Sequence, residues 1–195
     1  MMDSLNPIYV KYNEELKPLV SEIEGRLETF EEPLLERIME QFDYVALFVD
    51  EKDEELKSMY LLQAMTSLKL AVSASYQYLV YALLKKISLF KKRYGGKEAI
   101  ERLSDGEYAG LFEKLEKNIQ KNVRKGCRVD DNEALPYYKE AYEACAEQEQ
   151  IVELMSVARV KKQKLVYSIV AALMSIAVSV GVGFWVERFL SCVQW

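Results

Sequence analysis

Apolar and polar residues alternate along most of the chain with the period of an α-helix. From Asn6 to about residue 30, apolar residues recur every three or four positions, and the pattern resumes at 32–50. This spacing places the apolar side chains on one face of a helix, so the sequence predicts two amphipathic helices. Pro7 follows a capping residue at the start of the first helix, and Pro18 predicts a kink or a break within it.

The third predicted helix forms the centre of the N-terminal part. No proline or glycine occurs between its capping residue, Asp50 or Asp53, and Gly95, so a single helix of about 40 residues is expected. Its middle, 61–84, is apolar on nearly every face, which is typical of a helix enclosed by neighbours. Four tyrosines are interpreted as residues at the edge of the core, with subunit contact as the alternative: Tyr60, Tyr76, Tyr78 and Tyr81.

Three further helices are predicted after the paired glycines that end the central helix. Residues 97–103 form a short helix, Ser104 or Asp105 begins another that ends at Gly126, and Asn132 caps a last helix that has Pro136 in its first turn. No strong helix breaker follows, so the last helix is expected to run for about 50 residues. We expect it to act as a stem that leads from the bundle into the apolar segment that follows.

The stretch from 165 to 185 contains no charged side chain. At about 1.5 Å per residue, its length matches the roughly 30 Å hydrocarbon core of a bilayer, so we predict one transmembrane helix. Four basic residues precede it, whereas the other flank has one arginine beside one glutamate. This bias is expected to keep the large N-terminal part in the cytoplasm. The four basic residues are Arg159, Lys161, Lys162 and Lys164.

Small residues recur every four positions within the predicted span, at Ala171, Ser175, Ser179 and Gly183. Such a ladder lets helix backbones approach closely in lipid, so it predicts that copies of the chain associate through this face. The alternative is a chance pattern, because Ala, Ser and Gly are common in membrane helices.

These elements predict an all-α protein whose cytoplasmic helical bundle occupies 1–160. A juxtamembrane basic segment and the transmembrane helix follow at 161–190, and 191–195 form a short tail on the far side. The long C-terminal helix is expected to continue from the bundle into the single span. The predicted localisation is therefore a single-pass membrane protein with a cytoplasmic N-terminal domain.

The chain contains no histidine, which excludes several kinds of site. Ser-His-Asp and Cys-His nucleophilic sites, histidine-ligated zinc or haem, and histidine general bases all require it. The cysteines Cys127, Cys145 and Cys192 have no CxxC spacing, so they indicate neither a disulfide framework nor a metal site. The sequence therefore predicts a protein that is not an enzyme and has no catalytic residue, cofactor or metal.

Charge is unevenly distributed along the chain. Residues 1–60 carry 16 acidic and 6 basic side chains, whereas 85–128 carry 13 basic and 6 acidic ones. The basic cluster Lys91, Lys92 and Arg93 is therefore a candidate contact with the acidic part of a second copy. The alternative is that the two regions pair within one subunit. Nucleic acid is not an expected partner, because no aromatic residues are interleaved with the basic ones.

A compact helical bundle with a basic patch resembles the HEPN superfamily in overall layout. The ribonuclease motif of that family is an arginine followed several residues later by a histidine, and this chain has no histidine. The resemblance therefore implies a helical layout without the ribonuclease activity.

Two functions remain open, and both have the lipid bilayer as a partner. The first is a membrane effector, in which identical copies gather and form a pore or perturb the bilayer. It is similar in outline to small bacterial single-span proteins that accompany CRISPR-type antiviral defence systems. The second is a passive tail-anchored adaptor or tether that recruits a cytoplasmic protein partner to the membrane. The ladder favours the oligomeric effector, because an adaptor does not need it.

Overall fold

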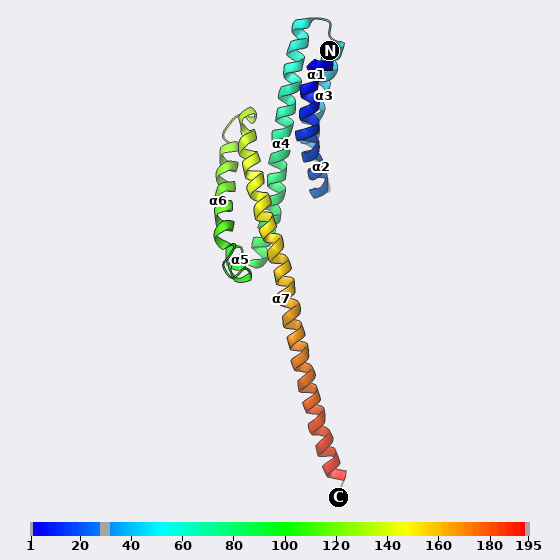
Figure 1. Cartoon of the computed structure of the whole chain (residues 1–195), viewed down its shortest axis with the longest axis vertical. Helices are drawn as coiled ribbons and strands as arrows, with labels where there is room; N and C mark the ends of the chain where they lie inside the picture. Colours follow the sequence, from blue (N-terminus) through cyan, green and yellow to red (C-terminus); the bar gives the residue numbers. More distant parts are fainter. Residues whose placement is uncertain (1, 28–31, 194–195) are drawn as a thin grey trace. The chain divides into compact units, whose positions relative to one another are not determined.

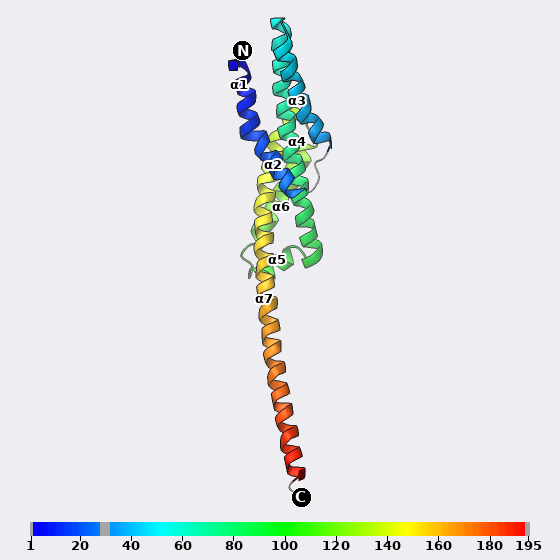
Figure 2. The same ribbon diagram turned by 90° about the vertical axis from the view of Figure 1, so that its right-hand side faces the viewer.

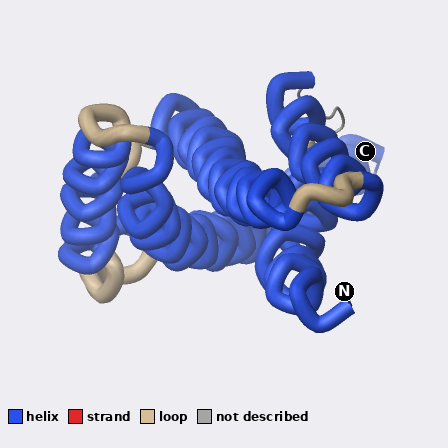
Figure 3. Tube along the Cα trace, turned by 90° about the horizontal axis from the view of Figure 1, so that it is seen from above, coloured by secondary structure: helices blue, strands red, loops and turns tan. Residues whose placement is uncertain are grey.

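The computed structural model describes the backbone of residues 2–27 and 32–193, with side chains at 5–27, 32–159 and 165–171. Within these residues the chain is helical, with no strand, and short loops join the helices (Figures 1 and 3). The predicted all-α class is therefore confirmed for the described part. The α-helices are α1 (Met2–Lys11), α2 (Lys17–Arg26), α3 (Glu32–Asp50), α4 (Glu54–Tyr94), α5 (Lys97–Leu103), α6 (Ala109–Gly126) and α7 (Asp131–Val193).

The chain divides into two compact units, Met1–Val152 and Glu153–Trp195. The first unit contains α1 to α6 and the beginning of α7, and α4 is its central helix. The first half of α4 contacts α1, α2 and α3, with α3 antiparallel beside it (Figures 1 and 2). The second half of α4 lies beside α6 and the beginning of α7, as ion pairs from Lys91 to Glu116 and from Lys86 to Glu149 show.

The first predicted helix is divided, but its break lies before Pro18 rather than at it. A π-helical turn, Tyr12–Leu16, separates α1 from α2, and Pro18 occupies the first turn of α2. The ring of a proline clashes with the carbonyl four residues earlier in an α-helix, and a wider turn upstream relieves that clash. Two predicted boundaries are wrong as well. The helix already begins at Met2, so that Pro7 lies inside it, and α2 ends at Arg26 rather than near residue 30.

The predicted helices at 32–50 and across the following 40 residues are confirmed as α3 and α4. The Asp53 side chain caps α4 by accepting hydrogen bonds from the backbone N–H groups of Glu55, at 2.9 Å, and Leu56, at 3.1 Å. Gly95 ends the helix with φ +93°, and its N–H donates to the carbonyl of Lys91 at 2.9 Å. Glycine adopts this left-handed conformation without the steric cost of a Cβ atom, which explains the stop.

The short helix at 97–103 is confirmed as α5, whereas the predicted start of the next helix is wrong. Asp105 and Gly106 have φ values of +51° and +89°, and both positions interrupt the helical path. The hydroxyl of Ser104 donates to the carbonyl of Ile100 at 2.6 Å, so this residue closes α5 rather than capping α6. The start of α6 is consequently delayed to Ala109.

The core surrounds α4, although this helix is not covered on every side as its apolar sequence suggested. Leu68, Leu79 and Val80 have no exposed surface, whereas Leu62 is 66% exposed. Most of the other buried apolar residues of the first unit come from the helices around α4: Ile8, Leu16, Ile23, Leu34, Ile38, Ile100, Phe112, Ile119, Tyr138, Ala141 and Cys145. Of the four tyrosines assigned to the edge of the core, Tyr60, Tyr76 and Tyr78 are half-buried and Tyr81 is 45% exposed.

Helix α7 begins at Asp131, so that Asn132, its predicted cap, already lies inside the helix, and it is helical to Val193. Among the residues whose side chains are described, no helix is long and apolar enough to cross a membrane. Of the span predicted at 165–185, residues 172–185 lie outside those residues. The predicted span therefore stays a prediction.

Candidate functional site

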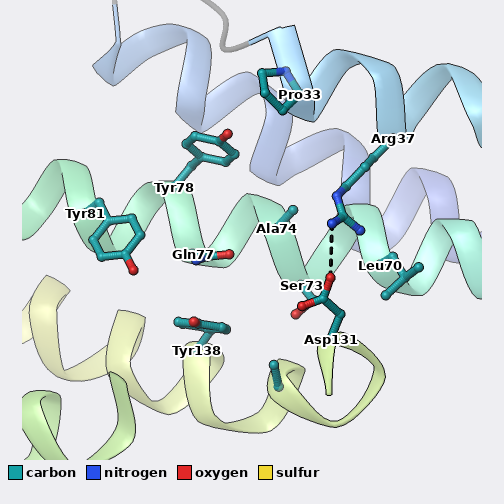
Figure 4. Close-up of a pocket in the computed structure, with 11 residues that line it drawn as sticks. Pro33, Arg37, Leu70, Ser73, Ala74, Gln77, Tyr78, Tyr81, Asp131 and Tyr138 are labelled. Carbon is teal, nitrogen blue, oxygen red and sulfur yellow. Dashed lines mark hydrogen bonds and ion pairs between the residues drawn. The ribbon is translucent and has the colours of Figure 1, made fainter. Parts of the chain in front are cut away.

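A cavity of about 230 Å³ lies among α3, α4 and α7 in the first unit (Figure 4). The first turns of α3, the middle of α4 and the first turns of α7 form its walls. Three phenol rings, one guanidinium group and one carboxylate converge there. Its lining residues are Pro33, Arg37, Leu70, Ser73, Ala74, Gln77, Tyr78, Tyr81, Asp131, Ala134 and Tyr138.

Helical spacing brings the lining residues to one side of each helix. Ser73, Gln77 and Tyr81 are four residues apart on α4, so they lie on one face one above the other. Arg37 extends from α3 toward Asp131 at the start of α7 (Figure 4). Its Nη2 donates to Asp131 Oδ2 at 3.0 Å. Because these side chains are 38% and 71% exposed, the ion pair contributes at most about 1 kcal/mol.

Among the cavity residues, Tyr138 is buried against the end of α6. It is 4% exposed, and its hydroxyl lies 3.5 Å from Cys127 Sγ. Its ring packs so closely on Gly126 that a Cβ atom there would lie 3.0 Å from Cζ of the ring. Burial, followed by the hydrogen bond with Cys127, raises the pKa of Tyr138 well above its usual value. The phenol therefore stays protonated at neutral pH and acts as a hydrogen-bonding group rather than as a base.

The cavity is small, and its charged lining groups are paired. Its volume lies below the roughly 300 Å³ at which pockets for drug-sized ligands begin. Asp131 is the one carboxylate among the described lining residues, and it is paired with Arg37. The described lining therefore presents hydrogen-bonding groups and aromatic rings, and its one guanidinium and one carboxylate are paired with each other.

A second polar cluster joins α2, α4 and α7 through Glu149, whose side chain is 8% exposed. Nη1 of Arg26 lies 2.9 Å from both carboxylate oxygens, and Lys86 Nζ lies 2.7 Å from Oε1. Beside it, the hydroxyl of Tyr142 donates to Glu22 Oε2 at 2.6 Å. Burial raises the pKa of Glu149, but the hydrogen bonds and charges of Lys86 and Arg26 outweigh it, so that its pKa is lowered. We call Arg26, Lys86 and Glu149 the Glu149 cluster.

Neither the cavity nor the Glu149 cluster was predicted from the sequence. The available signal for the cluster lies in the helical pattern of α7, where buried Tyr138, Ala141, Cys145 and Val152 define one face. Glu149 interrupts this face with a carboxylate, and a charged residue on a buried face requires a partner. The local pattern does not identify that partner, because Arg26 and Lys86 are 123 and 63 positions away from Glu149 in the sequence.

The basic cluster predicted at the end of α4 is partly engaged within the subunit. Lys91 Nζ lies 2.6 Å from Glu116 Oε1 of α6 and 5.4 Å from the ring centroid of Phe112. The guanidinium of Arg93 lies 5.4 Å from the ring of the adjacent Tyr94, and Lys92 is exposed. Lys91 therefore pairs with α6 and not with the acidic first helix. A contact of this cluster with a second copy stays a prediction.

The residues predicted for membrane association lie mainly beyond the described side chains. Arg159 is half-buried and Ala171 is exposed. The side chains of Lys161, Lys162 and Lys164 and those of Ser175, Ser179 and Gly183 lie outside the described residues. The predicted basic flank and small-residue ladder are therefore not tested by the structure.

The two described cysteines differ in burial. Cys145 is buried, and burial, followed by the charge of Glu149, raises its pKa to about 12. Cys127 is exposed, and Cys192 lies outside the described side chains. Among the side chains that the structure describes, no three Cys, Asp or Glu residues are grouped so that they could hold a metal ion.

Comparison with known proteins finds no matching family model, no matching curated protein and no matching solved structure. The assignment of a function therefore rests on the residues themselves.

Proposed function

We propose that this chain is an oligomeric, single-span, tail-anchored membrane protein. The observation that carries the proposal is the uncharged stretch 165–185, which directly follows the basic residues of 159–164. A helix of this length and composition partitions into a bilayer, and the basic flank holds its N-terminal side in the cytoplasm.

Two features of α7 support this proposal. Helical backbone extends through 165–185, and a helix satisfies its own hydrogen bonds, as a segment in hydrocarbon requires. At the start of the stretch, Leu165, Val166 and Tyr167 are 61%, 57% and 72% exposed. Consecutive exposed apolar side chains need a covering surface, and a bilayer supplies one.

Membrane perturbation is the proposed activity. Copies of the chain associate through Ala171, Ser175, Ser179 and Gly183, and their spans form a pore or disturb the bilayer. An accessory role in a bacterial CRISPR-type antiviral system is the biological setting we propose. The adaptor function is retained as the second candidate, because α3 exposes an apolar surface that is suited to a partner (see below).

Expression in bacteria loaded with a membrane-potential dye separates the two functions. Wild-type protein should depolarise the cells, and a variant whose 165–185 stretch is replaced by polyleucine should insert into the membrane without depolarising it. Both proteins must be recovered in the membrane fraction at equal levels. Unchanged ion permeability with wild-type protein in the membrane would favour the adaptor over the effector.

A further inference from the structure

Helix α3 carries two adjacent apolar stripes, of which one is used within the subunit. The inner stripe faces α4, and its members are spaced four and three residues apart in alternation. This heptad-like spacing keeps an apolar seam on one side of a helix. The inner stripe consists of four apolar residues and one glutamine: Leu34, Ile38, Gln41, Val45 and Phe48. All five are buried or half-buried, so this stripe accounts for the packing of α3 on α4.

The outer stripe repeats the same spacing one residue further along, and it is exposed. One residue corresponds to about 100° around a helix, so this stripe lies to one side of the contact with α4. Over 14 residues it extends for about 21 Å along the helix. Leu35, Met39, Phe42 and Val49 are 48%, 53%, 43% and 45% exposed, and the fifth member, Ala46, is also exposed.

Apolar surface continues from the outer stripe onto the neighbouring segment of the chain. The ring of Phe42 meets the ring of Tyr12, in the π-helical turn, edge to face at 5.5 Å between centroids. Tyr9, three residues earlier on α1, is 68% exposed. A contiguous apolar area of this kind on a soluble domain marks an interaction surface more often than isolated exposed residues do.

The far edge of the outer stripe is acidic. Glu36, Glu40, Asp43 and Asp50 follow the outer stripe by one position, about another 100° around α3, and all four are exposed. Within the described residues, none of these four carboxylates forms an ion pair inside the subunit. The outer stripe is thus an apolar seam with a row of uncompensated negative charge along one side.

We propose that the outer stripe of α3 is a docking surface for an amphipathic helix of a partner protein, whose apolar face is bordered by lysine or arginine. The apolar seam accepts the apolar face of that helix, as in other helix-in-groove complexes. The acidic row pairs with the basic border and selects the partner by charge. This proposal does not depend on the membrane span.

A second copy of this chain is a less suitable occupant than a basic helix. In an antiparallel two-fold contact between two α3 helices, the acidic row of one copy would lie against the acidic row of the other. Like charges that face each other across an interface cost several kcal/mol. An antiparallel pair of outer stripes therefore repels itself, whereas a basic helix matches the charge of the stripe.

The size of the surface sets the expected strength. A stripe about 21 Å long and about 10 Å wide offers roughly 200 Å², which is a fraction of the roughly 800 Å² per partner in a standard interface. Binding through α3 alone is therefore expected in the micromolar range, at about 10 µM or weaker. The acidic row should make this binding depend on salt, because charges beyond roughly 8 Å are screened at physiological ionic strength.

The test uses the full chain in nanodiscs of zwitterionic lipid and two fluorescent 18-residue helical peptides. Both peptides carry leucine at the seam positions, and the flanking positions are lysine in one and glutamate in the other. Anisotropy titrations should show the lysine peptide binding at least 10-fold more tightly than the glutamate peptide. Empty nanodiscs measure the binding of each peptide to lipid alone. Equal affinity for the two peptides, after this correction, would overturn the proposal.

Substitutions on α3 locate the binding surface. The double variant Met39→Ser and Val49→Ser removes apolar area without adding charge, so its affinity for the lysine peptide should fall at least 5-fold. Leu62→Ser on α4 is the matched control, because Leu62 is 66% exposed but lies outside the stripe. If the double variant keeps its affinity, the peptide does not bind at the outer stripe and the proposal is wrong.

Charge reversal tests the role of the acidic row. The triple variant Glu36→Lys, Asp43→Lys and Asp50→Lys should prefer the glutamate peptide, and an unchanged preference would refute the assigned role.

Mass photometry of the Met39→Ser and Val49→Ser variant addresses the second-copy alternative. A wild-type oligomer that dissociates in this variant would make the stripe a subunit interface and contradict the partner proposal, whereas an unchanged mass would support it.

Discussion

Replacing Glu149 by glutamine is expected to destabilise the helical bundle measurably. The substitution keeps the size of the side chain but removes the charge that Arg26 and Lys86 share. It also replaces one carboxylate oxygen by an amide N–H₂ group, which cannot accept a hydrogen bond. Both basic side chains therefore lose their charged partner at a position where α2, α4 and α7 meet, although Arg26 keeps an ion pair with Glu22, whose Oε1 lies 2.7 Å from its Nε.

The size of the effect follows from the exposure of the three side chains. Removing one partner of a fully buried ion pair costs about 3–5 kcal/mol. Glu149 is 8% exposed, but Arg26 and Lys86 are 30% and 50% exposed and regain hydration when the carboxylate is lost. Solvent screening therefore reduces the expected loss to about 1–2 kcal/mol. For a domain of this size, that loss corresponds to a decrease in Tm of roughly 2–8 °C.

The pH dependence of this difference has a definite sign. The pKa of Glu149 is lowered in the folded protein, so the folded state favours the ionised carboxylate. Its contribution is fully present above the unfolded carboxyl pKa of about 4.3 and is lost as the pH falls through the lower folded pKa. The Tm difference between the wild type and Glu149→Gln should therefore be constant near neutral pH and shrink below about pH 4.

Circular dichroism at 222 nm is the suitable assay, with the full chain in a neutral detergent. The two tryptophans are Trp185 and Trp195, so tryptophan fluorescence would not report on the bundle. Glu147→Gln is the matched control, because Glu147 is exposed on the same helix and its loss should change stability by less than about 0.5 kcal/mol. Equal Tm values for the Glu149 and Glu147 variants at pH 7 would refute the reasoning.

Four further substitutions have clear expected outcomes. Gly126→Ala should lower bundle stability by about 1–3 kcal/mol in thermal melts, because its Cβ would lie 3.0 Å from Tyr138, whereas Gly110→Ala, which meets nothing within 4 Å, should raise it slightly. Gln41→Leu should stabilise the bundle by about 1 kcal/mol in denaturant titrations, because the buried Oε1 has no hydrogen-bond partner among the described residues. Gly183→Leu should reduce the oligomer mass in mild detergent without preventing membrane insertion, and an unchanged mass would place the ladder against lipid.

The sequence predicted the helices best where glycine, proline and capping residues mark their ends. The bounds of α3 and α4 follow from Pro33, Asp53 and Gly95, each of which restricts the local backbone. The π-helical turn could not be predicted, because Pro18 signals a disturbance without fixing the turn in which the backbone absorbs it. The delayed start of α6 was missed because Ser104 resembles a capping residue whether it begins one helix or ends another.

The functional surfaces were harder to predict than the helices, because each depends on contacts between distant segments. The chain has 31 acidic residues, and local sequence does not distinguish Glu149 as the one shared by Arg26 and Lys86. The apolar residues of α3 were visible in its periodic pattern. The pattern alone does not reveal that they form two stripes, because the division depends on where α4 packs.

Protease protection of a C-terminal tag tests the central claim, the single span at 165–185, most directly. Sealed inverted membrane vesicles expose the cytoplasmic side to the protease. The account predicts that digestion removes the bundle and leaves a protected fragment of the span, the tail and the tag, which becomes degradable when detergent opens the vesicles. Digestion of the tag in intact vesicles, or release of the whole chain by alkaline carbonate, would contradict the claim.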